Sequence, residues 1–252
     1  MRLYLGGDTH CGSVVGLTPP KWQTTPQQQE MWDTWRKGLR KHRPFDIAIW
    51  NGDLIDGKSS RTGATDVITA DRRVQIQMAR QCVEAVKAPV NLFTYGTPYH
   101  AGEGEDWEGI LADMLNATIK SHLYLDIAGV QFSIKHKVGS STIPHGRFTP
   151  LAKERVWDAI WHDEKDQHPK SRVLVRSHVH FHNYCGKNGP DWWLAMTLPA
   201  LQGLGSKYGA RQCSGVVDFG FVWMDVDKGQ VKAWDAEIQV LETHKNEVLT
   251  FV

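Results

Sequence analysis

The chain has 252 residues, of which 41% are hydrophobic and 23% charged, which is typical of a soluble globular protein that buries a sizeable core. Its 29 Lys and Arg residues balance 28 Asp and Glu residues, which argues against a surface that is basic overall, although not against a local basic patch. The four cysteines form no C-x-x-C pair, and no segment is apolar enough for a signal peptide or a membrane span. We therefore expect free thiols, a cytoplasmic protein and no association with membranes.

The first half of the chain is predicted to alternate between strands and helices. Short apolar runs indicate strands, and apolar residues spaced three to four apart indicate helices. In chain order, we expect a strand at 3–5, a helix at 27–42, a strand at 45–50, a helix at 71–86, a strand at 90–95 and a helix at 105–115.

The second half is predicted to consist mainly of strands. We expect them at 123–127, 130–135, 172–176, 192–197, 216–226 and 230–235, with one helix at 149–162. Alternation followed by a run of strands favours an α/β fold in which a parallel sheet faces a more antiparallel one, with helices outside.

Asp and His side chains follow five of the predicted strands. They are Asp8 and His10, Asp53, His100, His136, and the pair His178 and His180. The carboxyl ends of parallel strands converge on one crevice of an α/β sheet, so these side chains are expected to gather there. Carboxylates and imidazoles suit divalent transition metals, and two such ions roughly 3.5–4 Å apart can clamp the oxygens of a phosphoryl displacement. The sequence therefore predicts a dinuclear metal site.

Each motif alone is a weak signal, and the prediction depends on their combination. D-x-H and N-G-D segments are common as caps and turns. The segment His178-Val179-His180 is more specific, because imidazoles at a period of two point to the same side of a strand. By itself, His136, which stands between two lysines, would be interpreted as a surface residue.

The order of the motifs resembles that of the calcineurin-like metallophosphoesterase superfamily, which is D-x-H, G-D, G-N-H-[DE], a single His and G-H-x-H. Four blocks match, at Asp8-Thr9-His10, Gly52-Asp53, His136 and Ser177-His178-Val179-His180. Ser177 replaces a glycine, which we interpret as a minor change. The resemblance spans residues 3–180 and implies an α/β, four-layer αββα sandwich of two mixed sheets flanked by helices. It also implies one domain over residues 1–252.

The resemblance also implies a ligand set. Asp8, His10 and His180 would hold one ion, His136 and His178 would hold the second, and Asp53 would bridge the two. Manganese is the preferred metal, with zinc, iron, nickel and magnesium as alternatives. Asp56 is expected to orient a ligand by a hydrogen bond, or to belong to a turn.

The third block departs from the family pattern. Gly96-Thr97-Pro98-Tyr99-His100 stands where the family has an Asn that binds the second ion and a His that assists the leaving group. Two alternatives remain open for His100, which is either the general acid or a replacement for the missing Asn ligand. Thr97 is an uncertain ligand, and Glu103 and Glu105 are further polar candidates.

The resemblance implies an enzyme that hydrolyses phosphomonoesters or phosphodiesters with a hydroxide activated by two metal ions. One alternative is a nuclease that uses the same site on DNA or RNA, so the partner is a phosphate ester that includes nucleotides or nucleic acid. Another alternative is a metal-binding or scaffold protein without turnover, which the altered third block would allow. His145 and Arg147 are candidate phosphate contacts, and the basic segment 36–43 is either a solvated helix face or a nucleic-acid contact. The sequence does not specify an oligomeric state.

Overall fold

Two β-sheets lie face to face in the computed structural model, which describes residues 1–58, 65–102, 104–141, 143–165, 168–205 and 217–244. The first sheet has the order β11-β10-β1-β2-β3-β4. Its parallel strands are β1 (Arg2–Gly6), β2 (Ile47–Asn51), β3 (Val90–Thr94) and β4 (Thr118–Lys120). β10 (Phe219–Asp227) pairs antiparallel with β1 and with β11 (Gln230–Gln239).

The second sheet has the order β5-β6-β7-β9-β8. Its three central strands, β6 (Val130–Ile134), β7 (Val173–Arg176) and β9 (Trp193–Thr197), run parallel. The edge strands β5 (Leu123–Ile127) and β8 (Asn183–Lys187) are antiparallel to their neighbours. Both sheets are therefore mixed.

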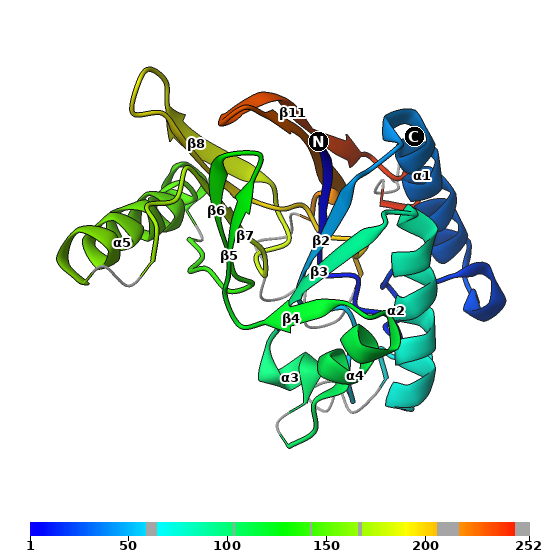
Figure 1. Ribbon diagram of the computed structural model, residues 1–252. Coiled ribbons are helices and arrows are strands. Elements are labelled where there is room, and N and C mark those ends of the chain that lie inside the picture. The colour runs from blue at the N-terminus through cyan, green and yellow to red at the C-terminus, as the bar shows by residue number, and fades with distance from the viewer. Residues whose placement is uncertain (59–64, 103, 142, 166–167, 206–216, 245–252) are drawn as a thin grey trace, which may run out of the picture.

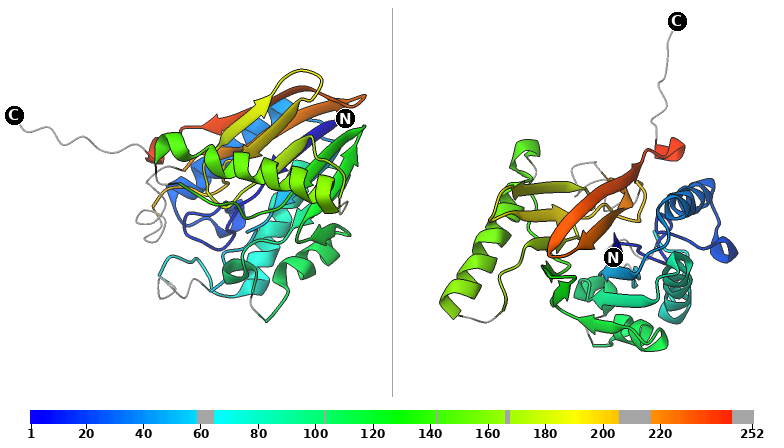
Figure 2. Two further views of the ribbon diagram at one scale, coloured as in Figure 1. Left: turned by 90° about the vertical axis from the view of Figure 1, so that its left-hand side faces the viewer. Right: turned by 45° about the horizontal axis from the view of Figure 1, so that its top comes forward.

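Helices cover the outer faces of the two sheets (Figure 1). α1 (Pro26–His42), α2 (Arg72–Val86) and α4 (Trp107–Met114) pack on the first sheet, and α5 (Thr149–Lys165) lies on the second. Figure 2 shows α5 and the pair α1 and α2 on opposite sides of the sheets. The remaining helical turns are η1 (Pro20–Trp22), α3 (Pro98–Ala101), η3 (Pro144–Gly146) and η4 (Glu242–His244). The structure confirms the predicted α/β sandwich of two mixed sheets flanked by helices.

Separate apolar cores hold these layers together. The core between the sheets contains Leu3, Leu5, Ile49, Phe132 and Val175, all buried. A second core lies between the first sheet and its helices, and a smaller one lies under α5. Strands β1, β2, β6 and β7 contribute to the inter-sheet core, so their carboxyl ends are fixed relative to one another.

Several element boundaries differ from the prediction. Strands β4 and β8 were not predicted, because Thr118–Lys120 is short and Asn183–Lys187 is a partly exposed edge with one apolar ring. The helix expected at 105–115 begins at Trp107, because the Asp106 side chain caps it by accepting a hydrogen bond from Gly109 N. The strand expected at 216–226 begins at Phe219, and Val216 lies outside the described residues. None of the helices within the described ranges has the length and apolar character of a membrane span.

The Tyr4 hydroxyl offers a test of the outer core of the first sheet. Tyr4 is fully buried and accepts a hydrogen bond from Trp35 Nε1 at 3.2 Å. We expect Tyr4→Phe to lower the free energy of unfolding by about 1–3 kcal/mol, because the Trp35 N–H loses its partner in a dry core. Urea denaturation measures the loss. Tyr184→Phe on exposed β8 is the control and should change little, and equal effects of the two substitutions would contradict this account.

Candidate metal centre

The loops that follow β1, β2, β6 and β7 bring six predicted ligands to one end of the two sheets. Asp8, His10, Asp53 and His136 are at most 3% exposed, and His178 and His180 are partly buried. His136 is therefore an interior residue, although its two lysine neighbours favoured a surface position when the motif was considered alone. The grouping matches the convergence expected of parallel strand ends.

Five of these six residues have left-handed backbone conformations. The φ angles are 48° at Asp8, 43° at His10, 51° at Asp53, 75° at His178 and 58° at His180. Such angles cost energy in residues with a Cβ and tend to occur at functional sites. Backbone hydrogen bonds hold the strained segments, since Asp8 N donates to Gly52 O at 2.9 Å and His10 N donates to Asp53 O at 3.0 Å. The side chains are therefore directed inward by the backbone itself.

Two glycines make room for the site. A Cβ at Gly52 would lie 2.6 Å from His136 Nδ1, and Gly52 also has a φ of 76°. A Cβ at Gly96 would overlap the backbone nitrogen and Oδ1 of Asp53. Gly52 and Gly96 are thus required by the close approach of the second and third blocks to the predicted ligands.

The ligand atoms form three overlapping groups, each of which could hold a metal ion. The groups are Asp8 with His10 and His180, Asp53 with His136 and His178, and His10 with Asp53 and His100. Within each group, the ligand atoms lie within 4.8 Å of one another. In the first, His180 Nε2 is 3.3 Å from both Asp8 Oδ1 and His10 Nε2. In the second, His136 Nε2 is 3.0 Å from Asp53 Oδ2.

Three buried side-chain atoms of these residues make no hydrogen bond within the described part of the chain. They are His10 Nδ1, Asp8 Oδ1 and His136 Nε2, and the last two lie 3.9 Å apart. Buried polar atoms in folded proteins are nearly always satisfied, so each such atom needs an explanation. Divalent cations provide one, because a carboxylate oxygen and an imidazole nitrogen are both donors of lone pairs to metals. The donor set therefore fits metal ions.

The electrostatic interactions among these side chains support the same conclusion. Burial opposes ionisation of Asp8, but the imidazoles of His136, His10 and His180 outweigh burial and hold its pKa well below the usual value. The pKa of Asp53 is lowered in the same way, chiefly by His136 and His100. Burial disfavours the charged form of His136, yet Asp53 and Asp8 raise its pKa to about 10. Buried carboxylates thus attract positive charge, and metal ions would replace the imidazole protons that supply it.

The third block lies beside the site and differs from the family arrangement. Thr97 donates its backbone N–H to Asp53 Oδ1 at 2.6 Å, and its hydroxyl lies 3.1 Å from the same oxygen. His100 belongs to the group with His10 and Asp53, and not to the group with His136 and His178. Burial lowers the pKa of His100, and the charge of Asp53 partly opposes this effect.

Asp56 lies between two of the imidazoles. Its carboxylate is 3.3 Å from His10 Nδ1, and its backbone oxygen accepts a hydrogen bond from His100 Nδ1 at 2.7 Å. The carboxylate also lies 3.7 Å from His100 Nδ1. Within the described chain, the hydrogen bond between Asp56 and these rings involves its backbone oxygen, and an orienting role for its carboxylate stays a prediction.

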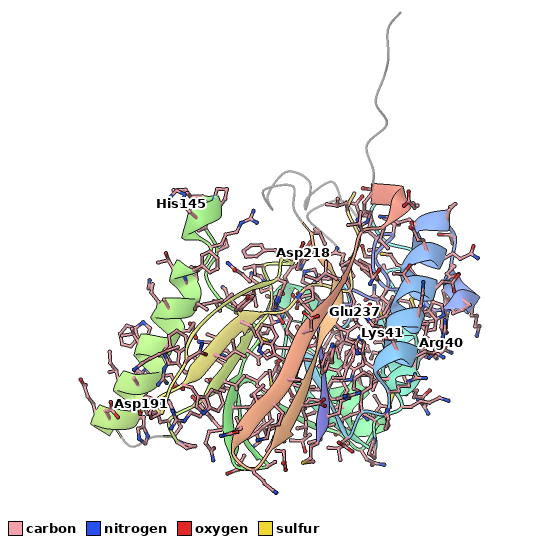
Figure 3. All side chains as sticks on the ribbon, turned by 90° about the horizontal axis from the view of Figure 1, so that it is seen from above. Arg40, Lys41, His145, Asp191, Asp218 and Glu237 are labelled. Carbon is pink, nitrogen blue, oxygen red and sulfur yellow. The ribbon has the colours of Figure 1, made fainter. Side chains whose placement is uncertain are left out.

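Other candidates lie away from the metal groups. Glu105 is exposed and pairs with Arg72, while Glu103 lies outside the described residues. The Asp218 backbone N–H donates to His180 O, so Asp218 marks the position of the site in Figure 3. His145 is exposed and lies apart from Asp218, on the side of α5. Arg147 lies nearer to the site, because its Cζ is 4.5 Å from the centroid of the Phe181 ring, and Phe181 follows His180 in the sequence.

The basic segment 36–43 lies on α1, and Figure 3 shows Arg40 and Lys41 beside Glu237, on the other side of the molecule from His145. Lys41 Nζ is 2.8 Å from Glu237 Oε2, so part of its charge is neutralised within the chain. The solvated helix face and the nucleic-acid contact therefore both stay predictions for this segment.

Two further polar residues support the site and were not recognised as part of it in the sequence. Asn51 is fully buried and donates from Nδ2 to Ser177 Oγ at 2.9 Å, so Ser177 provides a partner that glycine lacks. Glu108 on α4 is also fully buried and accepts hydrogen bonds from Leu54 N and Gly96 N. Burial and the charge of Asp53 raise the pKa of Glu108 to about 7. The sequence could have predicted that Glu108 is buried. It lies three residues before Leu111 and four before Ala112, which places this acid on the apolar face of the helix.

Comparisons with known proteins concern the fold. No protein-family model matches the chain, and no curated protein matches it significantly in sequence. Among solved structures, an archaeal phosphodiesterase has 14% identity over 94% of this chain and 99% of its own, with a TM-score of 0.49. Vps29 from Entamoeba histolytica in complex with zinc has 13% identity over 95% and 98% of the two chains, with a TM-score of 0.45. A dimetal phosphatase from Danio rerio has 10% identity over 90% and 93%, with a TM-score of 0.44.

At these identities and TM-scores, the similarities carry no argument about the chemistry of this chain. The chemistry therefore has to be argued from the geometry of the strand ends.

Gly96→Ala tests the steric constraint on the third block. The added methyl group would displace Asp53, so we expect the free energy of unfolding to fall by about 1–3 kcal/mol. Metal uptake should fall as well. Gly104→Ala is the matched control, because a Cβ there would meet no atom within 4 Å. Chemical denaturation and metal analysis of both variants give the measurement, and a Gly96→Ala protein indistinguishable from Gly104→Ala would contradict the constraint.

Proposed function

We propose that the chain is a metal-dependent phosphoesterase that hydrolyses phosphomonoesters or phosphodiesters with two divalent ions. The observation that supports this proposal most is the presence of overlapping groups of ligand atoms around buried Asp53 and Asp8. Two ions held close together can stabilise both the attacking and the leaving oxygens of an in-line displacement at phosphorus.

In this proposal, Asp8, His10 and His180 would hold one ion, and His136 and His178 would hold the other. Asp53 would contribute to both, since its carboxylate belongs both to the group with His10 and to the group with His136. When bound, the ions would lower the pKa of a water molecule and neutralise charge on the phosphate oxygens. Manganese is the metal we propose, because the site mixes carboxylate with imidazole, and zinc, iron, nickel and magnesium are the alternatives to test.

The ligands are held by hydrogen bonds from neighbouring residues. Asn51 O accepts from His136 Nδ1 at 2.7 Å, which leaves Nε2 as the nitrogen with the lone pair. His178 N donates to Asp8 Oδ2 at 3.2 Å, which leaves Oδ1 directed at the imidazoles. The site is therefore oriented before any ion binds.

For His100 we propose the role of proton donor to the leaving group. A replacement for the missing Asn ligand would have to lie with His136 and His178, whereas His100 lies with His10 and Asp53. Its Nδ1 donates to Asp56 O, so Nε2 is the nitrogen available to a substrate. Asp53 is in turn held by Thr97, which supports a positioning role for Thr97.

The main experiment combines metal analysis with an activity screen. We expect about two transition-metal ions per chain after loading with Mn. The screen covers p-nitrophenyl phosphate, its bis-ester, and single- and double-stranded DNA, each with Mn, Mg, Zn and Ni. Asp53→Asn should abolish nearly all activity and weaken the binding of both ions. Asp56→Asn should lower activity by only roughly 10–100-fold. Equal effects of these substitutions would contradict the bridging role of Asp53.

The outcomes of the screen separate the alternatives. Two bound ions without hydrolysis of any ester would favour a scaffold protein. Hydrolysis of DNA alone, with binding that weakens steeply as salt is raised, would favour a nuclease. Absence of bound metal in an active preparation would overturn the dinuclear proposal.

His100→Ala tests the proton donor. We expect metal content to stay the same and kcat to fall by roughly 10²–10⁴-fold. The loss should be smaller for p-nitrophenyl esters than for alkyl esters, because a weakly basic leaving oxygen needs little protonation. Metal stoichiometry and rates on both kinds of ester are measured. Loss of metal that excess Mn reverses, with equal effects on both esters, would show that His100 is a ligand instead.

A further inference from the structure

Glu108 joins the second and third blocks through its side-chain carboxyl group. Its side chain is fully buried, Oε1 accepts from Leu54 N at 2.8 Å, and Oε2 accepts from Gly96 N at 2.7 Å. Leu54 follows Asp53 directly, and Gly96 precedes Thr97. One carboxylate therefore links the loop after β2 to the loop after β3.

The consequence of this link falls on Asp53. Gly96 lies so close to Asp53 that a Cβ would overlap it, and the Thr97 N–H donates to Asp53 Oδ1 at 2.6 Å. A small separation of the two loops would break that short hydrogen bond and turn the Asp53 carboxylate. Displacements of about 1 Å at a reactive site have large effects, so the spacing of the loops matters for metal geometry.

The chemistry requires a carboxylate at this position. Two backbone N–H groups donate to the two carboxyl oxygens, and each of these oxygens can accept a hydrogen bond whether or not the group is protonated. A glutamine of the same shape keeps one acceptor but turns an NH₂ group toward the other N–H donor. Isosteric packing is thus preserved by Gln, whereas the link between the loops is not.

We propose that Glu108 is a positioning residue that sets the orientation of Asp53 by accepting hydrogen bonds from both loops, and thereby controls metal affinity. This inference rests on the proposed metal-dependent function. Glu108 belongs to none of the candidate metal groups, and it acts through Leu54 and Gly96.

The test compares Glu108→Gln with a matched buried carboxylate. Asp158 on α5 is 5% exposed and accepts from Ser171 N at 3.1 Å and from Ser171 Oγ at 2.7 Å, and it belongs to none of the candidate metal groups. We expect Glu108→Gln to weaken Mn binding roughly 10–100-fold and to change the spin-coupled EPR signal of the Mn-loaded protein. Asp158→Asn should lower thermal stability without altering either readout.

A measurement on the wild-type protein tests the inference whether or not the variants fold. The amide protons of Leu54 and Gly96 should exchange slowly and shift downfield in NMR spectra, as expected of donors to a buried carboxylate. Fast exchange of both amides would overturn the inference. Unchanged Mn affinity and EPR signal in folded Glu108→Gln would also overturn it, while absence of Mn binding by the wild-type protein would instead overturn the proposed function.

Discussion

The side chain of Asn51 holds the two sheets together at the point where the candidate ligands meet. Its Oδ1 accepts from Thr94 Oγ1 at 2.6 Å on β3, and its Nδ2 donates to Lys135 O and to Ser177 Oγ in the second sheet. Its backbone oxygen accepts from His136 Nδ1. The apolar core between the sheets is not directional, and these buried hydrogen bonds add a directional constraint on how the two sheets are aligned at this point. Because Asp53 lies on one sheet and His136 and His178 on the other, the distances among them depend on this amide.

The candidate ligands are held in backbone conformations that lower the stability of the fold. Left-handed conformations in residues such as Asp8, Asp53 and His178 cost of order 1–3 kcal/mol each, and buried charges add to that cost. The surrounding structure compensates, since the strained segments are short and each follows a strand anchored in an apolar core. Loops Asp8–His10 and Gly52–Leu54 also share backbone hydrogen bonds, so neither can relax alone. The mutual repulsion of Asp8 and Asp53 is relieved by the imidazoles between them, and bound cations would relieve it further.

The sequence predicted the layers and most of the candidate ligands, and it failed where a contact depends on segments distant in the chain. Apolar runs identified strands such as β2 and β7 because they are buried on both faces. Strand β8 was not predicted, because it is an exposed edge strand with few apolar residues. The burial of His136 was not predicted by its flanking lysines, since only the packing of β6 against β2 turns the imidazole inward. Ser177 was interpreted as a neutral replacement of glycine, whereas its hydroxyl is the partner of Asn51, 126 residues away in sequence.

A helical turn brings His100 of the third block to the side of Thr97 and Asp53. In the family pattern the His follows the Asn directly, whereas here His100 comes three residues after Thr97. Residues Pro98–Ala101 form the turn α3, in which His100 N donates to Thr97 O at 3.0 Å. Residues three apart lie on the same side of a helical turn, so the turn returns His100 to the side of Thr97 and Asp53. Gly57 allows the close approach, since a Cβ there would lie 2.9 Å from His100 O. Pro98 and Tyr99, which separate His100 from Thr97, are thus accommodated within one helical turn. Asp56, next to Gly57, accepts a hydrogen bond from His100 Nδ1 and holds the His100 imidazole beside His10.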